Sequence, residues 1–230
     1  PAAPTPNNLC SGWLRPSAVE LIRVLFPLTA RANLCCSIEM GQNSTTHRVP
    51  LPGARTPAAG FDAPFDMLTA CHERVERMLT LLTRLQQHLV ASGCDLAAAQ
   101  ATHDVTRYFD LAGPAHHEDE ERHVFPGVEN QSPCTAALVA QLRAQHQSMK
   151  QQWHNSLRRY LQRVVQERLT ERHHAPLERR IRAFAQLYRG HIALEESQLY
   201  PAARALMDHK SQATMSLEMA HRRGAHLSRP

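Results

Sequence analysis

Four long stretches of helical periodicity follow one another from Phe61 onward, and a histidine interrupts the apolar stripe of each. Apolar side chains recur three and four residues apart, which is the period of an amphipathic α-helix. The four helices are predicted at about residues 64–90, 96–125, 132–164 and 176–206. Ser132-Pro133 is typical of a helix start, and Gly113-Pro114 predicts a kink in the second helix. The pattern predicts an all-α fold, an up-down-up-down four-helix bundle.

The second and fourth stretches end in two similar motifs. The first motif, "HHEDEERHVFP", begins at His116, and the second, "HIALEESQLYP", begins at His191. When the two are aligned on their final prolines, His116 matches His191 and Glu120 matches Glu195. Residues four apart lie on the same face of a helix, so each motif offers one imidazole and one carboxylate to the same space.

The polar interruptions of the four stripes are predicted to meet in one layer of the bundle. In an antiparallel hairpin of helices, two residues lie at the same level when the turn falls midway between them. The predicted turns fall midway between the interruptions of each successive pair of helices. The layer contains His72, His116, Glu120, His146, His191 and Glu195. Two buried carboxylates are costly unless cations or protons compensate them, so this layer predicts a metal site.

The ligand types indicate which metal the layer would hold. Nitrogen and carboxylate ligands without a thiolate favour iron, manganese or zinc, and two carboxylates among four histidines favour a dinuclear site. We predict two non-heme iron ions, with manganese and zinc as less favoured metals. The Glu-x-x-His pattern of ferritin-like di-metal sites is the alternative ligand arrangement. It occurs at Glu120/His123, Glu171/His174 and Glu218/His221. Two of these pairs fall in a predicted turn and a predicted tail, so this arrangement is not favoured.

Other polar residues near the layer receive secondary roles. Glu121 and Glu196 directly follow the predicted ligands and are expected to be hydrogen-bonding partners rather than ligands. His123 lies seven residues after His116 and is an alternative extra ligand. His117 has no place in the stripe and is predicted to face solvent. The same is predicted of His88, His103, His154, His173, His174, His209, His221 and His226.

The segments on either side of the helical region lack a sustained period. Residues 1–60 are rich in Pro, Asn, Ser and Thr and are predicted to be an extension or linker, with some helix in its apolar part. A natural start at Met40 is an open alternative. Residues 208–230 are polar and basic and are predicted to be a frayed tail. One domain is therefore expected at residues 61–207.

Composition narrows the classes of function. The formal net charge is +5, but the arginines are scattered and lack interleaved aromatic residues, so no nucleic-acid partner is expected. No run of eighteen apolar residues occurs, so no membrane span is expected. The six cysteines form no CxxC pair, which favours reduced thiols and a cytoplasmic location.

From about Phe61 to Leu206 the sequence resembles the hemerythrin-like HHE cation-binding domain. The resemblance rests on the two quoted motifs and on the single histidines of the other two helices, His72 and His146. It implies that the four histidines of the layer are terminal ligands and that Glu120 and Glu195 bridge two non-heme irons.

The chain departs from the oxygen-carrying hemerythrins at two places. Those proteins have a His-x-x-x-His pair on the third helix and an aspartate five residues after the fourth-helix histidine. Here Lys150 lies four residues after His146, and Glu195 lies four residues after His191. The chain is therefore more similar to the six-ligand members, such as iron–sulfur-repair di-iron proteins and iron-sensing domains.

The resemblance implies a di-iron protein that binds or reacts with dioxygen, nitric oxide or peroxide in sensing or stress response. A conventional enzyme is not expected, although weak oxidase or peroxidase activity fits such a centre. Two alternatives stay open. One is a non-enzymatic iron-storage or iron-sensing module, and the other is a metal-free helical protein that binds an unknown protein partner.

Overall fold

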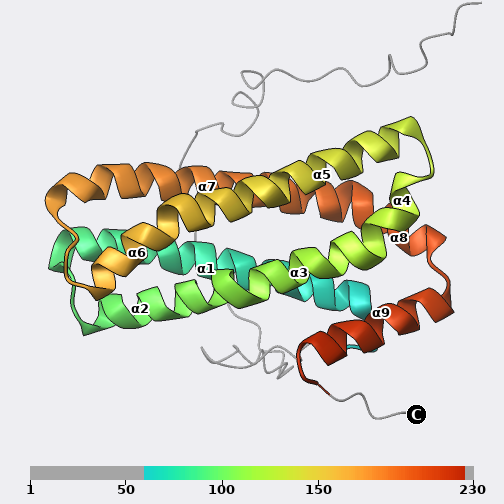
Figure 1. Cartoon of the computed structure of the whole chain (residues 1–230), viewed down its shortest axis with the longest axis horizontal. Helices are drawn as coiled ribbons and strands as arrows, with labels where there is room; N and C mark the ends of the chain where they lie inside the picture. Colours follow the sequence, from blue (N-terminus) through green and yellow to red (C-terminus); the bar gives the residue numbers. More distant parts are fainter. Residues whose placement is uncertain (1–59, 226–230) are drawn as a thin grey trace, which may run out of the picture. The chain divides into compact units, whose positions relative to one another are not determined.

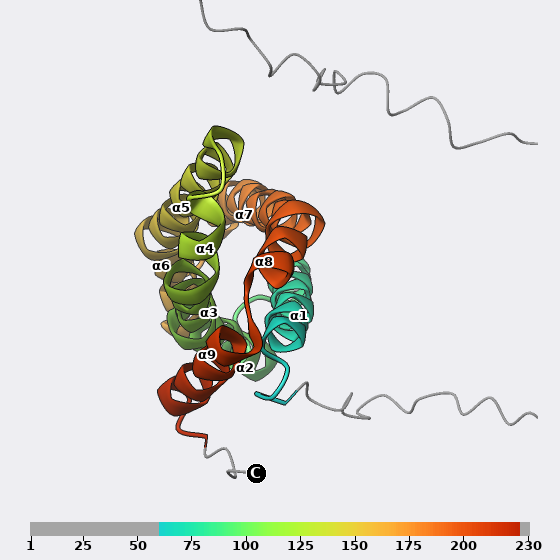
Figure 2. The same ribbon diagram turned by 90° about the vertical axis from the view of Figure 1, so that its right-hand side faces the viewer.

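The structure is a computed structural model that describes residues 60–225, and within this range it contains helices and no strand. Four helical rods run in alternating directions and confirm the predicted all-α bundle (Figure 1). The rods consist of α1 (Pro64–Ser92), of α2 (Leu96–Arg107) with α3 (Gly113–Asp119) and α4 (Phe125–Glu129), of α5 (Pro133–Gln152) with α6 (Arg158–Val165), and of α7 (His174–Leu194) with α8 (Tyr200–Leu206). Helix α1 packs against α2 and α7, α5 packs against α7, and Figure 2 shows the rods around a shared axis.

Short turns with capping residues reverse the chain between rods. Gly93 follows α1 with a φ of 75°, a left-handed conformation that glycine adopts without a Cβ clash. Asp95 then caps α2 by accepting a hydrogen bond from the Ala98 N–H at 2.8 Å. Ser132 caps α5 in the same way, since the Thr135 N–H donates to its Oγ at 3.1 Å. The predicted start of the third helix is confirmed.

Four π-helical turns interrupt the rods within the described residues; one is Trp153–Leu157 in the third rod, and the other three end two residues ahead of a proline. These three are Tyr108–Ala112 before Pro114, Glu120–Val124 before Pro126, and Glu195–Leu199 before Pro201. In each case the residue before the proline donates its N–H to the carbonyl five residues back. A proline has no N–H and its ring clashes with the carbonyl four residues back, and a wider turn relieves that clash. The kink predicted at Gly113-Pro114 takes this form, and both motifs begin a π turn at their glutamate.

The apolar core is divided into two clusters. One lies toward the α1–α2 turn and includes Leu79, Leu82, Phe109, Trp153 and Phe184. The other lies toward α4 and α8 and includes Phe65, Phe125, Leu142 and Leu199. In every rod the predicted ligands fall between the residues of the two clusters. The polar layer therefore separates two dry regions of the bundle.

A fifth helix, α9 (His209–Arg222), replaces the frayed tail that the polar sequence suggested (Figure 1). Asp208 caps it by accepting the Ser211 N–H at 2.8 Å. Met215 and Met219, four residues apart, are fully buried, and α9 packs against α1 and α3. The prediction of a frayed tail was wrong here, because Met215 and Met219 pack one face of α9 against the bundle although most of its other positions are polar.

Several sequence predictions lie outside the described residues. These are the extension at residues 1–59, the start at Met40, the thiols of Cys10, Cys35 and Cys36, and the position of His226. Between residues 60 and 225, every helix is too short or too polar to cross a membrane.

Candidate metal centre

The structure brings all six predicted ligands together in the layer between the two apolar clusters. Each of the six side chains belongs to a residue that is at most 3% exposed. They are His72 from α1, His116 from α3, Glu120 at the start of the following π turn, His146 from α5, His191 from α7, and Glu195 at the start of the π turn after it. The six residues lie at the same level of the bundle because each of the three turns falls about midway between the residues on the two rods that it joins, as the sequence predicted.

One half of the layer contains His72 and His116. Their Nε2 atoms are 3.1 Å apart and face each other. Glu195 Oε2 lies 3.2 Å from His72 Nε2, and Glu120 Oε1 lies 3.5 Å from His116 Nε2. Four donor atoms from four residues thus converge on one point.

The other half contains His146 and His191. Their Nε2 atoms are 3.0 Å apart. Glu195 Oε1 lies 2.8 Å from His191 Nε2, and Glu120 Oε2 lies 3.6 Å from His146 Nε2. Each glutamate therefore directs one oxygen into each half.

This arrangement forms two groups of four donors that share both glutamates, and within each group the donor atoms lie within 4.8 Å of one another. Glu120 Oε2 and both oxygens of Glu195 are buried and have no hydrogen-bond partner among the described residues. Their short contacts with the imidazole nitrogens meet the distance of an ion pair but not the alignment of a hydrogen bond. Buried carboxylate oxygens without partners are costly, and two metal ions would satisfy them. The residues fit a dinuclear site.

Hydrogen bonds on the far side of the imidazoles orient three of the four rings. His72 Nδ1 lies 2.9 Å from Glu196 Oε1, and His146 Nδ1 lies 2.7 Å from Glu121 Oε1. These contacts confirm the hydrogen-bonding role predicted for both acids. Gln145 Oε1 lies 2.9 Å from Nδ1 of His191, a partner the sequence analysis missed. An acceptor at Nδ1 keeps the proton there and leaves the Nε2 lone pair free for a metal.

The two central glutamates differ in their electrostatic environment. Burial, together with the negative charge of Glu195, holds the pKa of Glu120 well above its usual range. Burial also acts to raise the pKa of Glu195, but contacts with the imidazoles of His146, His191 and His72 outweigh it and hold that pKa well below its usual range. The two carboxylates of the layer are therefore not electrostatically equivalent.

Tyr200 is a neighbour of the layer that sequence reasoning missed. Its hydroxyl donates to Glu120 Oε1 at 2.5 Å and lies 3.2 Å from His72 Nε2. Its ring stacks on His72 with centroids 5.5 Å apart. The signal was present in the alignment of the motifs, where Tyr200 matches Phe125, and the two residues differ by this hydroxyl.

His117 does not face solvent, which corrects the sequence prediction. Its ring stacks on that of His146 with centroids 3.9 Å apart and an interplanar angle of 14°. Burial and the nearby imidazoles hold its pKa well below the usual range. One helix position beyond His116 is a rotation of about 100°, which turns the side chain away from the layer and toward α5.

Further histidine predictions need adjustment. His123 contacts α9, where its Nε2 lies 3.2 Å from Arg222 Nη2, and it belongs to neither group of four donors. His173 is buried, and its Nδ1 accepts the Thr170 N–H at the start of the turn before α7. His88 and His174, which were also predicted to face solvent, are half-buried. The prediction of solvent exposure is confirmed for His103, His154, His209 and His221.

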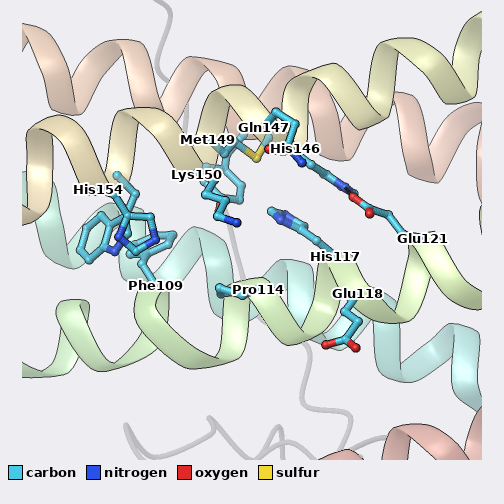
Figure 3. A pocket seen from close by; sticks show the side chains of 12 residues that line it. Phe109, Pro114, His117, Glu118, Glu121, His146, Gln147, Met149, Lys150 and His154 are labelled. Carbon is cyan, nitrogen blue, oxygen red and sulfur yellow. Dashed lines mark hydrogen bonds and ion pairs between the residues drawn. The ribbon is translucent and has the colours of Figure 1, made fainter.

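A pocket of about 210 Å³ reaches the His146 side of the layer (Figure 3). His117 and Pro114 on α3 line it from one side, and Lys150 on α5 lines it from the other. Figure 3 shows the His117 ring and the Lys150 side chain extending into the space between these helices. Of the six predicted ligands, His146 is the one that lines this pocket.

Comparison with known proteins identifies the family of this chain. The hemerythrin HHE cation binding domain model matches residues 63–203, a span that reaches into all four rods. An uncharacterized protein of Haemophilus influenzae (strain Rd) is 32% identical over 165 residues, which cover 72% of this chain and 92% of that protein. The chain therefore belongs to the hemerythrin HHE cation-binding domain family.

Proposed function

We propose that the protein is a non-heme di-iron protein whose centre binds or reacts with dioxygen, nitric oxide or peroxide. His72 and His116 would hold one iron, His146 and His191 would hold the other, and Glu120 and Glu195 would be shared. The observation that carries the proposal is the pair of four-donor groups that share two buried carboxylates. The family match and these clusters support metal binding as the general role.

The donor set supports iron among the candidate metals. Imidazole and carboxylate ligands without thiolate suit iron, with manganese and zinc ranking behind it. Bound iron would supply redox chemistry and coordination positions open to a small ligand, since the protein offers each ion four donors. The chain's similarity to six-ligand family members, rather than to oxygen carriers, is part of this proposal.

The surrounding residues prepare the site for such chemistry. Glu121, Glu196 and Gln145 orient the imidazoles, so their Nε2 atoms are positioned before a metal binds. The Tyr200 hydroxyl offers a proton donor at Glu120 Oε1. The apolar clusters above and below the layer exclude water, which strengthens every charge interaction within it.

We further propose a role in sensing or in the response to oxidative or nitrosative stress, with at most weak oxidase or peroxidase activity. A small diatomic molecule or a peroxide would be the ligand. The cytoplasmic location belongs to the same proposal, and the free thiols of Cys71 and Cys94 support it.

The test is metal analysis with absorption spectra on the full-length chain purified without oxygen from iron-fed cells. We expect about two irons per chain, in line with two four-donor groups. The spectrum should change when dioxygen, nitric oxide or hydrogen peroxide is added separately. Reproducible binding of one metal or none would contradict the dinuclear centre. Two irons with a spectrum that none of the three ligands alters would favour the iron-storage or iron-sensing alternative.

A further inference from the structure

Positive charge is concentrated where the third rod ends and the fourth begins. Residues 155–182 contain eight arginines and three glutamates, an excess of five positive charges. This excess equals the formal net charge of the whole chain, so the other residues contain as many acids as lysines and arginines. Figure 1 shows this turn at the same end of the bundle as the α1–α2 turn. Uncompensated charge of one sign in one place favours a partner of the opposite charge.

A pocket of about 140 Å³ lies among these residues, between the third rod and α7. Three arginines and three neutral polar residues line it, namely Arg159, Arg163, Arg180, Asn155, Ser156 and Tyr160. No aspartate or glutamate is among them. All six side chains can donate hydrogen bonds, so the pocket suits a ligand rich in acceptors and not a cation.

The three arginines have no carboxylate partner within residues 60–225. Arg159 makes no hydrogen bond or ion pair there. Arg163 Nη1 lies 2.8 Å from Nε2 of His173, but burial and the charge of Arg163 lower the pKa of that ring, so this contact balances no charge. Arg180 Nη1 donates to the carbonyl of Pro176 at 3.2 Å. Arg159 and Arg163 are four residues apart on one helix, a spacing at which like charges repel.

Tyr160 orients one of the guanidinium groups. Arg180 Cζ lies 5.3 Å from the centroid of the Tyr160 ring. A guanidinium held against an aromatic ring keeps its plane, and its N–H groups can then bind two oxygens of one oxyanion.

Ser156 distinguishes the pocket from an ordinary patch of surface charge. Its hydroxyl oxygen is buried and has no hydrogen-bond partner among the described residues. Ser156 belongs to the π-helical turn Trp153–Leu157, and the next proline along the chain is Pro176. A proline accounts for each of the other three π turns, whereas this turn has no such cause. Buried hydroxyls without partners are uncommon, and π turns are frequent at functional sites.

We propose that this pocket binds a phosphoryl group, carried by inorganic phosphate or by a phosphate monoester. The three guanidinium groups would bind the phosphate oxygens, and the Ser156 hydroxyl would donate to one of them. A phosphoryl dianion compensates more of the charge of three arginines than a monoanion does. The site is separate from the metal layer, because none of the residues that line it is a predicted metal ligand. It therefore does not depend on the proposed di-iron function.

Calorimetric titration of the full-length iron-loaded protein with inorganic phosphate, at constant ionic strength, tests the site. Arg159→Gln and Arg180→Gln should each weaken phosphate binding about tenfold or more, the usual loss for a hydrogen bond to a charged group. Arg179→Gln is the matched control, since it removes the same charge from an exposed neighbour that does not line the pocket. It should change the affinity by less than about twofold, because solvent and salt screen an exposed charge.

Equal losses in Arg179→Gln and Arg180→Gln would overturn the proposal, since the attraction would then be one of overall charge. Unchanged affinity in both variants would also overturn it, because the phosphate would then bind elsewhere, such as at the metal. If the protein takes up no iron, the proposed function fails, and the same titration of the protein as purified still decides the pocket.

Ser156→Ala separates ligand binding from a structural role. Without phosphate, the variant should unfold at the same temperature as the unmodified protein or higher, because no hydrogen bond is lost. Added phosphate should raise the unfolding temperature of the unmodified protein more than that of the variant, since a ligand stabilises a protein according to its affinity. Equal increases in the two proteins would contradict a ligand at this hydroxyl.

Adenosine monophosphate and adenosine distinguish the two sources of the phosphoryl group. Adenosine should not bind, because it lacks the group that the arginines recognise. Adenosine monophosphate binding about tenfold more tightly than phosphate, with the same loss in Arg180→Gln, would assign the site to a monoester. Similar affinities for the two phosphates would assign it to inorganic phosphate. Equal binding of adenosine and its monophosphate would overturn a phosphoryl site.

Discussion

The two motifs of this chain occupy equivalent places in the bundle but differ at seven of their eleven positions. They share the histidine, the glutamate four residues later, the second acid and the proline. Three of the differences change the surroundings of the layer, namely His117 against Ile192, Asp119 against Leu194, and Phe125 against Tyr200. The shared histidines and glutamates supply four of the six residues of the metal layer, and the shared second acids hydrogen-bond to the other two, His146 and His72.

Each of these three positions makes a contact that its counterpart in the other motif does not make. His117 lines the pocket beside His146. Asp119 is fully buried. It accepts hydrogen bonds from Arg222, the last residue of α9, and from Arg223, which follows it. The Tyr200 hydroxyl donates to Glu120. The comparison teaches that the repeat supplies the ligands, whereas the departures from it give the two halves different surroundings.

The largest expected effect concerns the shared positions. Glu120→Ala and Glu195→Ala should each lower bound iron from about two per chain to below about one, because each removes a donor from both halves. The measurement is metal analysis of the purified variants at saturating iron.

The adjacent acids provide the matched controls. Glu121→Ala and Glu196→Ala should retain about two irons and lose roughly tenfold to a hundredfold in affinity, the usual cost of removing a partner that orients a ligand. If Glu121→Ala emptied the site and Glu120→Ala did not, the alignment of the motifs would be wrong by one residue and His117 would replace His116 as the ligand.

The second prediction tests what Asp119, which stands where the other motif has Leu194, contributes to stability. Replacing Arg222 and Arg223 together by Met leaves the Asp119 carboxylate buried and unpaired, which should cost about 3 kcal/mol of the free energy of unfolding. Asp119→Leu, which copies the second motif, should cost less because both arginines are partly exposed and can turn to water. Urea denaturation gives the cost, and hydrogen exchange of α9 amides shows whether this helix detaches. A larger loss in Asp119→Leu than in the double variant would contradict the account.

The third prediction removes the hydroxyl that distinguishes Tyr200 from Phe125. Tyr200→Phe should lower the stability of the iron-loaded protein by about 1 kcal/mol, the net value of one hydrogen bond, and keep both irons. Thermal denaturation with metal analysis measures both. Tyr160→Phe is the control, because the Tyr160 hydroxyl makes no hydrogen bond within the described part of the chain. Identical effects of the two substitutions would show that the Glu120 contact contributes nothing.

The smallest effect on metal content is expected at His117. His117→Ile gives the first motif the residue of the second, and the iron content should stay at about two per chain because all six residues of the layer are unchanged. A nitrogen of His117 lies within 4.8 Å of donor atoms on His146 and His191, so this variant tests directly whether His117 is a ligand. Loss of one iron in this variant would make His117 a ligand.

Much of the fold and the layer could be predicted from the sequence because both depend on local periodicity. Apolar spacing identifies the four rods, and Ser132 identifies the start of the third. The i, i+4 spacing places His116 with Glu120 and His191 with Glu195 on one face each. The turn positions then set the level of His72 and His146, without any knowledge of how the rods are packed.

The contacts that differ between the motifs could not be predicted in this way. Asp119 and Arg222 are 103 residues apart, and a single ion pair at that separation leaves no periodic pattern in the sequence. Helix α9 was missed for the same reason, since its apolar face has few members and its docking depends on that buried carboxylate. The sequence around Tyr200 does not show whether its hydroxyl contacts a ligand residue or water.

The sequence by itself determined the bundle, the register of its motifs and the six residues of the layer, because helical period and turn position specify both the face and the level of a residue. Tertiary structure alone decided that His117 faces a pocket, that Asp119 anchors a fifth helix and that Tyr200 reaches Glu120. These positions lie at or beside the edge of a stripe, and there the neighbouring helix, rather than the period of the residue's own helix, sets what the side chain contacts.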